Sequence, residues 1–134
     1  MTNKIDWIIH GVIPKEGDLD YAMDYHTHGL REFHNHPELM IVLSIRDEVA
    51  VDILNSIGLC ICDGEKFDEE RIYTNILANN LPTKMVKARM GDEDVMVIVF
   101  PDSYGKLPGE EGCEEPYNNQ IKIIEFFETR YKLN

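Results

Sequence analysis

Basic residues are scarce in this chain: 13 lysines and arginines stand against 25 aspartates and glutamates, which gives a formal net charge of −12. The negative field of such a chain repels phosphate backbones and anionic lipid headgroups. We therefore expect no nucleic acid and no membrane among its partners. The acidic excess would suit a basic protein partner or a cation, and it also favours solubility.

Cysteine is scarce as well, and the three cysteines, Cys60, Cys62 and Cys113, form no Cys-x-x-Cys pair. An odd number of thiols without that spacing argues against a disulfide framework and against a zinc finger. No stretch approaches the roughly eighteen apolar residues of a membrane-spanning helix. The N-terminus also lacks the apolar run of a signal peptide. We therefore expect a cytoplasmic protein.

The sequence motifs of well-known enzymes are also missing. The chain has no His-Glu-x-x-His helix, no Gly-x-Ser-x-Gly nucleophile turn and no glycine-rich phosphate or dinucleotide loop. Ser103, beside Asp102, therefore has no support as a nucleophile. Glutamates around Cys113 would raise the pKa of that thiol and make it a poor nucleophile. Motifs thus assign no reaction to this chain.

The hydrophobic pattern predicts a single α+β domain over residues 1–134. At this length roughly two-thirds of the unfolded chain's surface can be buried, so the core needs no covalent support. Two continuous apolar runs, 39–45 and 95–100, are typical of central strands. Further strands are expected at 5–13, 21–28, 71–77 and 84–90, with turns at 14–20, 79–82 and 91–93.

Two helices are expected to cover this sheet. Residues 47–63 carry apolar side chains at helical spacing, with Asp47 as the N-cap and Gly64 as the stop. The segment 120–131 fits both a helix and a strand, and we prefer the helix. Strands outnumber helices and do not alternate with them regularly. The expected fold is therefore a mainly antiparallel sheet covered by two or so helices.

Histidines are concentrated in one short segment. Four of the five, His26, His28, His34 and His36, fall within eleven residues, and His10 lies upstream. On a strand, His26 and His28 would project to one face with their Cα atoms about 7 Å apart. A turn after them could bring His34 or His36 alongside. These four histidines are the candidate metal ligands, for a divalent metal such as zinc.

Four residues are candidates for catalysis: His28, His36, Glu38 and Asp102. The histidines could carry protons near neutral pH, Glu38 could act as a general base or ligand, and Asp102 could orient a histidine. Each also has a structural explanation. A histidine ring often binds a backbone carbonyl, and carboxylates beside a strand often cap loop amides or turns.

Two segments are predicted to be loops, 29–37 and 101–119. The second holds three prolines and three glycines together with several glutamates. A long irregular segment in a small domain is usually either functional or mobile. We expect both loops at one end of the sheet, where they would form the main pocket.

An ordered set of short motifs resembles a known family. The motifs are His26-Thr-His-Gly-Leu30, His36-Pro-Glu-Leu39, Ile53-Leu-Asn55, Pro101-Asp102, and Cys113-Glu-Glu-Pro-Tyr117 with Gln120. Together they resemble the bacterial domain of unknown function 4262 family over most of the chain. Many members look like Tyr-Thr-x-Gly-Leu at the first motif. The resemblance therefore implies that a metal site at His26 and His28 is not shared by every member of the family. It implies a bacterial source, and it supplies no established activity to carry over to this chain.

Two functions from different classes remain open. One is a metal-binding protein or small metal-dependent hydrolase that uses the histidine cluster. The other is a non-catalytic binding or interaction domain with a histidine-rich pocket, whose partner would be a basic protein or a second copy in a homodimer. We prefer the second narrowly, because no catalytic motif supports the first.

Overall fold

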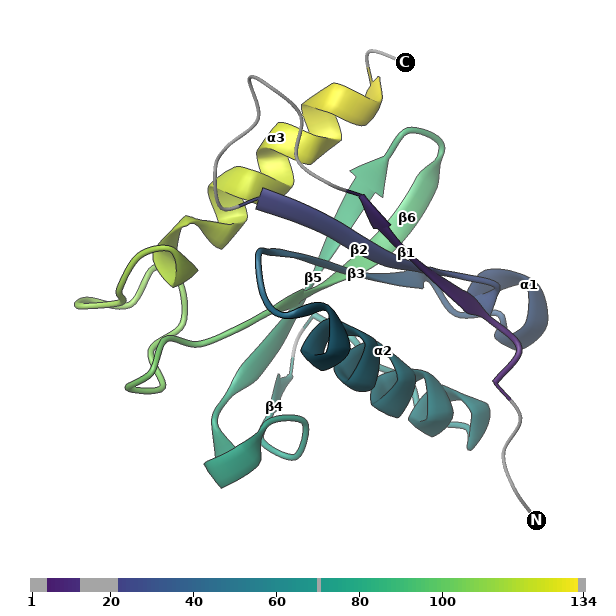
Figure 1. Cartoon of the computed structure of the whole chain (residues 1–134), viewed down its shortest axis with the longest axis horizontal. Coiled ribbons are helices and arrows are strands. Elements are labelled where there is room, and N and C mark those ends of the chain that lie inside the picture. The colour runs from purple at the N-terminus through teal and green to yellow at the C-terminus, as the bar shows by residue number, and fades with distance from the viewer. Residues whose placement is uncertain (1–4, 13–21, 70, 133–134) are drawn as a thin grey trace.

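The computed structural model describes residues 5–12, 22–69 and 71–132. Within these residues six strands form one sheet, in the order β1-β2-β3-β6-β5-β4 (Figure 1). The strands are β1 (Ile8–Val12), β2 (Ala22–His28), β3 (Glu38–Leu43), β4 (Ile72–Tyr73), β5 (Thr83–Met90) and β6 (Glu93–Val99). The predicted α+β fold with a mainly antiparallel sheet is confirmed.

The two apolar runs form the centre of the sheet, as predicted. Strands β3 and β6 lie side by side and pair in parallel, with Glu38 opposite Val95 and Met40 opposite Val97. The other neighbouring strands pair antiparallel. Every residue of β3 is buried, because side chains pack against both faces of this part of the sheet.

Helix α2 (Asp47–Cys62) covers one face of the sheet (Figure 1). Its Leu54, Ile57 and Ile61 join Leu39 and Ile41 of β3 in one core. These helix positions follow the 3.6-residue period that predicted the element. Truncation of a fully buried leucine such as Leu54 to alanine costs about 2–5 kcal/mol, so this face contributes much of the stability.

The beginning of α2 differs by one residue from the prediction. Arg46, with an extended backbone, is the N-cap, and Asp47 is the first helical residue. The Tyr25 hydroxyl donates a 2.6 Å hydrogen bond to Asp47 Oδ1, which ties the helix to β2. Burial, together with this acidic neighbour, raises the pKa of Tyr25 to about 12. The predicted stop is confirmed, because Gly64 has a φ of +99° just after the helix.

Helix α3 (Gln120–Lys132) covers the opposite face (Figure 1). Its Ile123, Ile124 and Phe127 pack with Met40 and Val97 in a second core. The preference for a helix in this segment is confirmed. None of the described helices has the length and apolar character needed to cross a membrane.

Shorter elements depart from the expectations. The segment 29–37 contains a helix, α1 (Leu30–His34), which ends at Asn35 in a left-handed conformation. The predicted strand 71–77 shrinks to β4, and two short 3-10 helices are η1 (Ala78–Asn80) and η2 (Tyr117–Asn119). The predicted turn at 14–20 lies outside the described residues.

The prediction that segments 29–37 and 101–119 share one pocket is wrong. The first segment precedes β3, and the second follows β6. Because β3 and β6 run parallel, the start of one and the end of the other lie at opposite ends of the sheet. The prediction failed because apolar runs identify central strands without giving their direction.

Candidate functional site

The four predicted metal ligands lie in three different places among the described residues. His26 and His28 lie on β2, and His34 lies at the end of α1 beside Cys62 of α2. His36 is buried against Phe67, just before β3. The short helix α1 turns the chain away from β2, so the second His-x-His pair does not return alongside the first.

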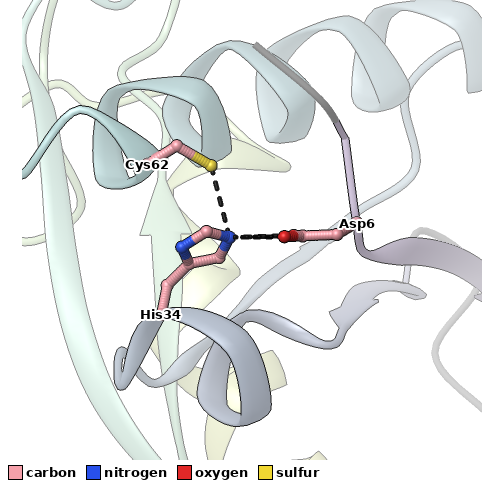
Figure 2. A group of neighbouring side chains, drawn as sticks. All are labelled: Asp6, His34 and Cys62. Carbon is pink, nitrogen blue, oxygen red and sulfur yellow. Dashed lines mark hydrogen bonds and ion pairs between the residues drawn. The ribbon is translucent and has the colours of Figure 1, made fainter.

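His34 forms a cluster with Asp6 and Cys62, two residues that were not among the predicted ligands (Figure 2). His34 Nε2 lies 2.8 Å from Asp6 Oδ1 and 3.3 Å from Cys62 Sγ. The three candidate ligand atoms all lie within 4.8 Å of one another. The side chain of His34 is 20% exposed and that of Asp6 is 34% exposed, so the cluster lies at the edge of the protein.

Trp7 holds the Asp6 segment against α2. Its indole Nε1 donates a 2.9 Å hydrogen bond to Asn55 Oδ1. Its ring occupies the space beside Gly58, where an added Cβ would lie 2.5 Å from a ring carbon. The same ring meets His34 edge-on at a centroid distance of 6.2 Å. Packing of one buried tryptophan therefore brings Asp6 to the end of α2.

The geometry of the Asp6–His34–Cys62 cluster is convergent. Both Asp6 and Cys62 approach the same nitrogen, His34 Nε2. A nucleophile triad needs the acid on one ring nitrogen and the nucleophile on the other, so that a proton can pass through the ring. Here both groups contact the same nitrogen, so no proton can pass through the ring, and the three atoms lie close enough together to be ligands of one ion.

Electrostatics also argue against a free nucleophile at Cys62. Burial raises the pKa of this thiol, and the nearby charges of Asp6 and Asp63 raise it further. A thiol kept protonated reacts poorly. A bound metal ion reverses this situation, because a coordinating thiol loses its proton.

A second group of histidines lies on the face of β1 and β2. His10, which sequence reasoning left aside, is the Cα partner of His26 in the antiparallel register. The two rings are stacked, with centroids 5.2 Å apart and planes at 25°. His28 meets them edge-on, at 5.5 Å from His10 and 6.3 Å from His26. In the sequence, only the strand-like alternation of side chains over residues 8–12 could have indicated His10 as a site residue.

Asp24 orients the central ring of this group. Its side chain is 3% exposed, and its Oδ1 accepts a 2.8 Å hydrogen bond from His26 Nδ1. The hydrogen bond to Asp24 raises the pKa of His26, although burial works in the opposite direction. Asp24 was also missed as a site residue, although its spacing two before His26 places it on the same face.

His36 is held through both ring nitrogens. Nδ1 lies 2.9 Å from the Pro37 carbonyl, and the Phe67 N–H donates to Nε2 over 3.5 Å. Burial lowers the pKa of His36, which favours the neutral ring. His36 and His34 both line a pocket of about 520 Å³ whose walls include Lys66 and Lys87.

Glu38 caps the start of α1. Its carboxylate accepts hydrogen bonds from the Thr27 hydroxyl and from the N–H groups of Gly29, Leu30 and Arg31, at 2.9–3.2 Å. The expectation that this carboxylate caps loop amides is confirmed. Its two oxygens are engaged by four donors, which makes it a structural cap.

Asp102 plays a similar part at the other end of the sheet. It accepts hydrogen bonds of 2.9 Å from the N–H groups of Tyr104, Lys106 and Glu114. Burial tends to raise the pKa of Asp102, but these three donors together lower it. The expected turn-capping role is confirmed. The residue orders the start of the 101–119 segment, at the end of the sheet away from α1.

Comparisons with known proteins add one finding. The sequence model of the family described as a domain of unknown function (DUF4262) matches residues 2–114. The match includes Asp6, His34, Cys62 and all three histidines of the second group. No curated protein and no solved structure matches the chain.

Proposed function

We propose that this chain, which belongs to the DUF4262 family, is a metal-binding protein that holds one divalent ion of the zinc class at Asp6, His34 and Cys62. The observation that carries the proposal is the convergence of a carboxylate, an imidazole and a thiol within 4.8 Å of one another. Zinc binds these three ligand types at about 2.0–2.3 Å, which places tetrahedral ligand atoms about 3.5 Å apart. The His34–Cys62 distance of 3.3 Å is already close to that spacing.

The donor set supports zinc over harder cations. Calcium and magnesium prefer shells of oxygen ligands, whereas a thiolate and an imidazole suit zinc and its transition-metal neighbours. Three protein ligands leave a fourth position for water or another molecule, as in catalytic zinc sites. We propose metal binding as the function, and hydrolysis is an activity to assay once the bound ion is known.

The test uses untagged full-length protein freed of metal with a chelator. Zinc affinity is measured by competition with a chromophoric chelator, and Co²⁺ substitution reports a thiolate ligand through its charge-transfer absorption. The key variant is Cys62→Ser, and Cys60→Ser is its matched control, two residues away on the same helix. We expect Cys62→Ser to weaken zinc binding more than about 10-fold and to remove the cobalt band.

Two results would overturn the proposal. One is a wild-type protein that binds no stoichiometric zinc. The other is a Cys62→Ser variant that binds zinc as tightly as the Cys60→Ser control does. A His34→Gln variant adds a second check, because loss of an imidazole ligand must weaken binding while the thiol stays in place.

Self-association is a second candidate function, supported by strand β1. Within the described residues β1 is an edge of the sheet, and none of its residues carries a formal charge in a chain of net charge −12. Ile8 is 58% exposed and Val12 41% exposed on this strand. Exposed apolar edge strands pair readily with another strand. An uncharged edge also lets two acidic chains meet there, so the partner we propose is a second copy of this chain.

Light scattering after size-exclusion chromatography tests this second candidate. We expect a wild-type dimer that becomes a monomer in Ile8→Lys, because a charged side chain blocks edge pairing. The matched control is Ile72→Lys on β4, which is the opposite edge of the sheet and is 52% exposed. A monomeric wild-type protein, or a dimer that only Ile72→Lys disrupts, would refute pairing through β1.

A further inference from the structure

The histidines of β1 and β2 are brought together by strand register. His10 and His26 are direct cross-strand partners, and His28 lies two residues along the same strand. Residues two apart on a strand share a face, and cross-strand partners have Cβ atoms about 4.5–5.5 Å apart. The three imidazoles therefore stand together on one face for a reason that does not depend on the rotamer of any ring.

Their separations fit a shared metal ion. Two imidazoles bound to one ion at about 2.0–2.1 Å per nitrogen have ring centroids roughly 5–6 Å apart. Two of the observed centroid distances, 5.2 and 5.5 Å, lie in this range, and the His26–His28 distance of 6.3 Å must shorten slightly when an ion binds. The stacked and edge-on ring planes mean that His10 and His28 must rotate to turn a nitrogen inward. Both are exposed, and exposed side chains change rotamer within nanoseconds.

A buried carboxylate provides the second, independent observation. Asp24 is 3% exposed and holds His26 through Nδ1 at 2.8 Å, which leaves Nε2 of that ring for a ligand. A carboxylate behind a metal-binding histidine fixes the ring and raises the basicity of its other nitrogen. A pocket of about 200 Å³ adjoins this ring, lined also by His28 and by Glu93. The pocket offers space for a further ligand beside His26 and His28, whereas His10 lies outside its walls.

We propose that His10, His26 and His28 form a second metal site, an all-imidazole site for Ni²⁺ or Cu²⁺, with Asp24 as the residue that positions His26. Imidazole suits these ions, and without a thiolate the order of intrinsic affinity places copper and nickel ahead of the earlier first-row metals. The site is independent of the Asp6–His34–Cys62 cluster, because the two share no residue. It goes beyond the proposed function, since either site can be present without the other.

The experiment measures Ni²⁺ affinity by calorimetry and counts nitrogen ligands from the Cu²⁺ electron paramagnetic resonance spectrum. Untagged full-length protein is compared with His10→Gln, His28→Gln and Asp24→Asn. The matched control is His34→Gln, which removes one histidine from the other cluster. Because His10 and His28 are exposed, their glutamine variants are expected to fold, and circular dichroism checks this.

We expect three nitrogen ligands in the wild type and two in His10→Gln or His28→Gln, with Ni²⁺ affinity at least about 10-fold weaker. Asp24→Asn keeps three nitrogens and loses roughly 10- to 100-fold in affinity, as removal of an outer-shell partner does elsewhere. His34→Gln removes only the signal of ions bound at the Asp6–His34–Cys62 cluster, and it leaves the three-nitrogen signal and its Ni²⁺ affinity unchanged. Wild-type behaviour in both His10→Gln and His28→Gln would overturn this site alone, whereas failure of the zinc experiment leaves it standing.

Discussion

The two histidine groups differ in how the fold holds them. The Asp6–His34–Cys62 cluster joins three segments, and it depends on Trp7 packing against α2. The triplet of His10, His26 and His28 stands on two neighbouring strands and depends on their register and on Asp24. A site made by packing can be disturbed from the core, whereas a site made by register is as stable as the sheet that carries it.

Glu38 supports both groups, so its substitution is expected to have the largest effect. The carboxylate joins Thr27, which lies between His26 and His28, to the start of the helix that carries His34. In Glu38→Gln an amide N–H₂ would face backbone donors, and a lost hydrogen bond to a charged group costs about 1.5–3 kcal/mol. We expect a loss of about 3 kcal/mol in the free energy of unfolding, measured in urea by circular dichroism.

The matched control for this variant is Glu125→Gln, an exposed carboxylate on α3 that undergoes the same chemical change. Surface substitutions of this kind stay within about 0.5 kcal/mol. A Glu38→Gln protein as stable as the control would mean that the α1 cap does not support either histidine group.

Gly58→Ala is expected to disturb the Asp6–His34–Cys62 cluster much more than the triplet of His10, His26 and His28. The new Cβ would lie 2.5 Å from the Trp7 ring, so the ring and the Asp6 segment must shift. Overpacking costs about 1–3 kcal/mol, and better helix propensity returns up to about 1 kcal/mol. We expect a net loss of about 1–2 kcal/mol and a red shift in the fluorescence of Trp7, the chain's single tryptophan.

Ser56→Ala, on the exposed side of the same helix, is the control and should change neither property. Chemical shifts of the His26 and His28 ring protons should change much less than those of His34 in Gly58→Ala, because β1–β2 pairing, and not the Trp7 ring, places those two residues. A shift of those resonances as large as that of His34 would show that both groups depend on the same packing.

Local patterns explain which parts of the fold were predictable. The strands β3 and β6 and the helix α2 follow from runs and periods within each segment, and the capping roles of Glu38 and Asp102 involve donors within twelve residues. His34 meets both Asp6 and Cys62 across 28 residues. No local pattern specifies that meeting, because it results from the docking of Trp7 beside Gly58.

The same reasoning applies to His10 and to the direction of the central strands. His10 faces His26 only because the β1–β2 register places them opposite, and the sequence of neither strand alone gives that register. A continuous apolar run likewise gives no sign of whether β3 and β6 pair in parallel. Sequence therefore identified the histidines as the unusual residues, and tertiary pairing decided how they are grouped.

The smallest expected effect concerns pH, and it has opposite signs for two histidines. Asp24 raises the pKa of His26 above its ordinary value of 6.5, so the stability from this pair is complete below that value and is lost as pH rises through the folded-state pKa. Burial lowers the pKa of His36 below 6.5, so its contribution is complete above 6.5 and is lost as pH falls toward the folded-state pKa. Urea unfolding between pH 5 and 8.5 should therefore show a loss of unfolding free energy at both ends of this range in the wild type. The loss at high pH should disappear in His26→Gln, and the loss at low pH should disappear in His36→Gln. For each histidine, the slope of the free energy of unfolding against pH cannot exceed about 1.4 kcal/mol per pH unit, which is the limit for one proton. If His26→Gln changed the acidic side instead, Asp24 would not be holding a protonated ring, and the β1–β2 triplet would lose the residue that positions it.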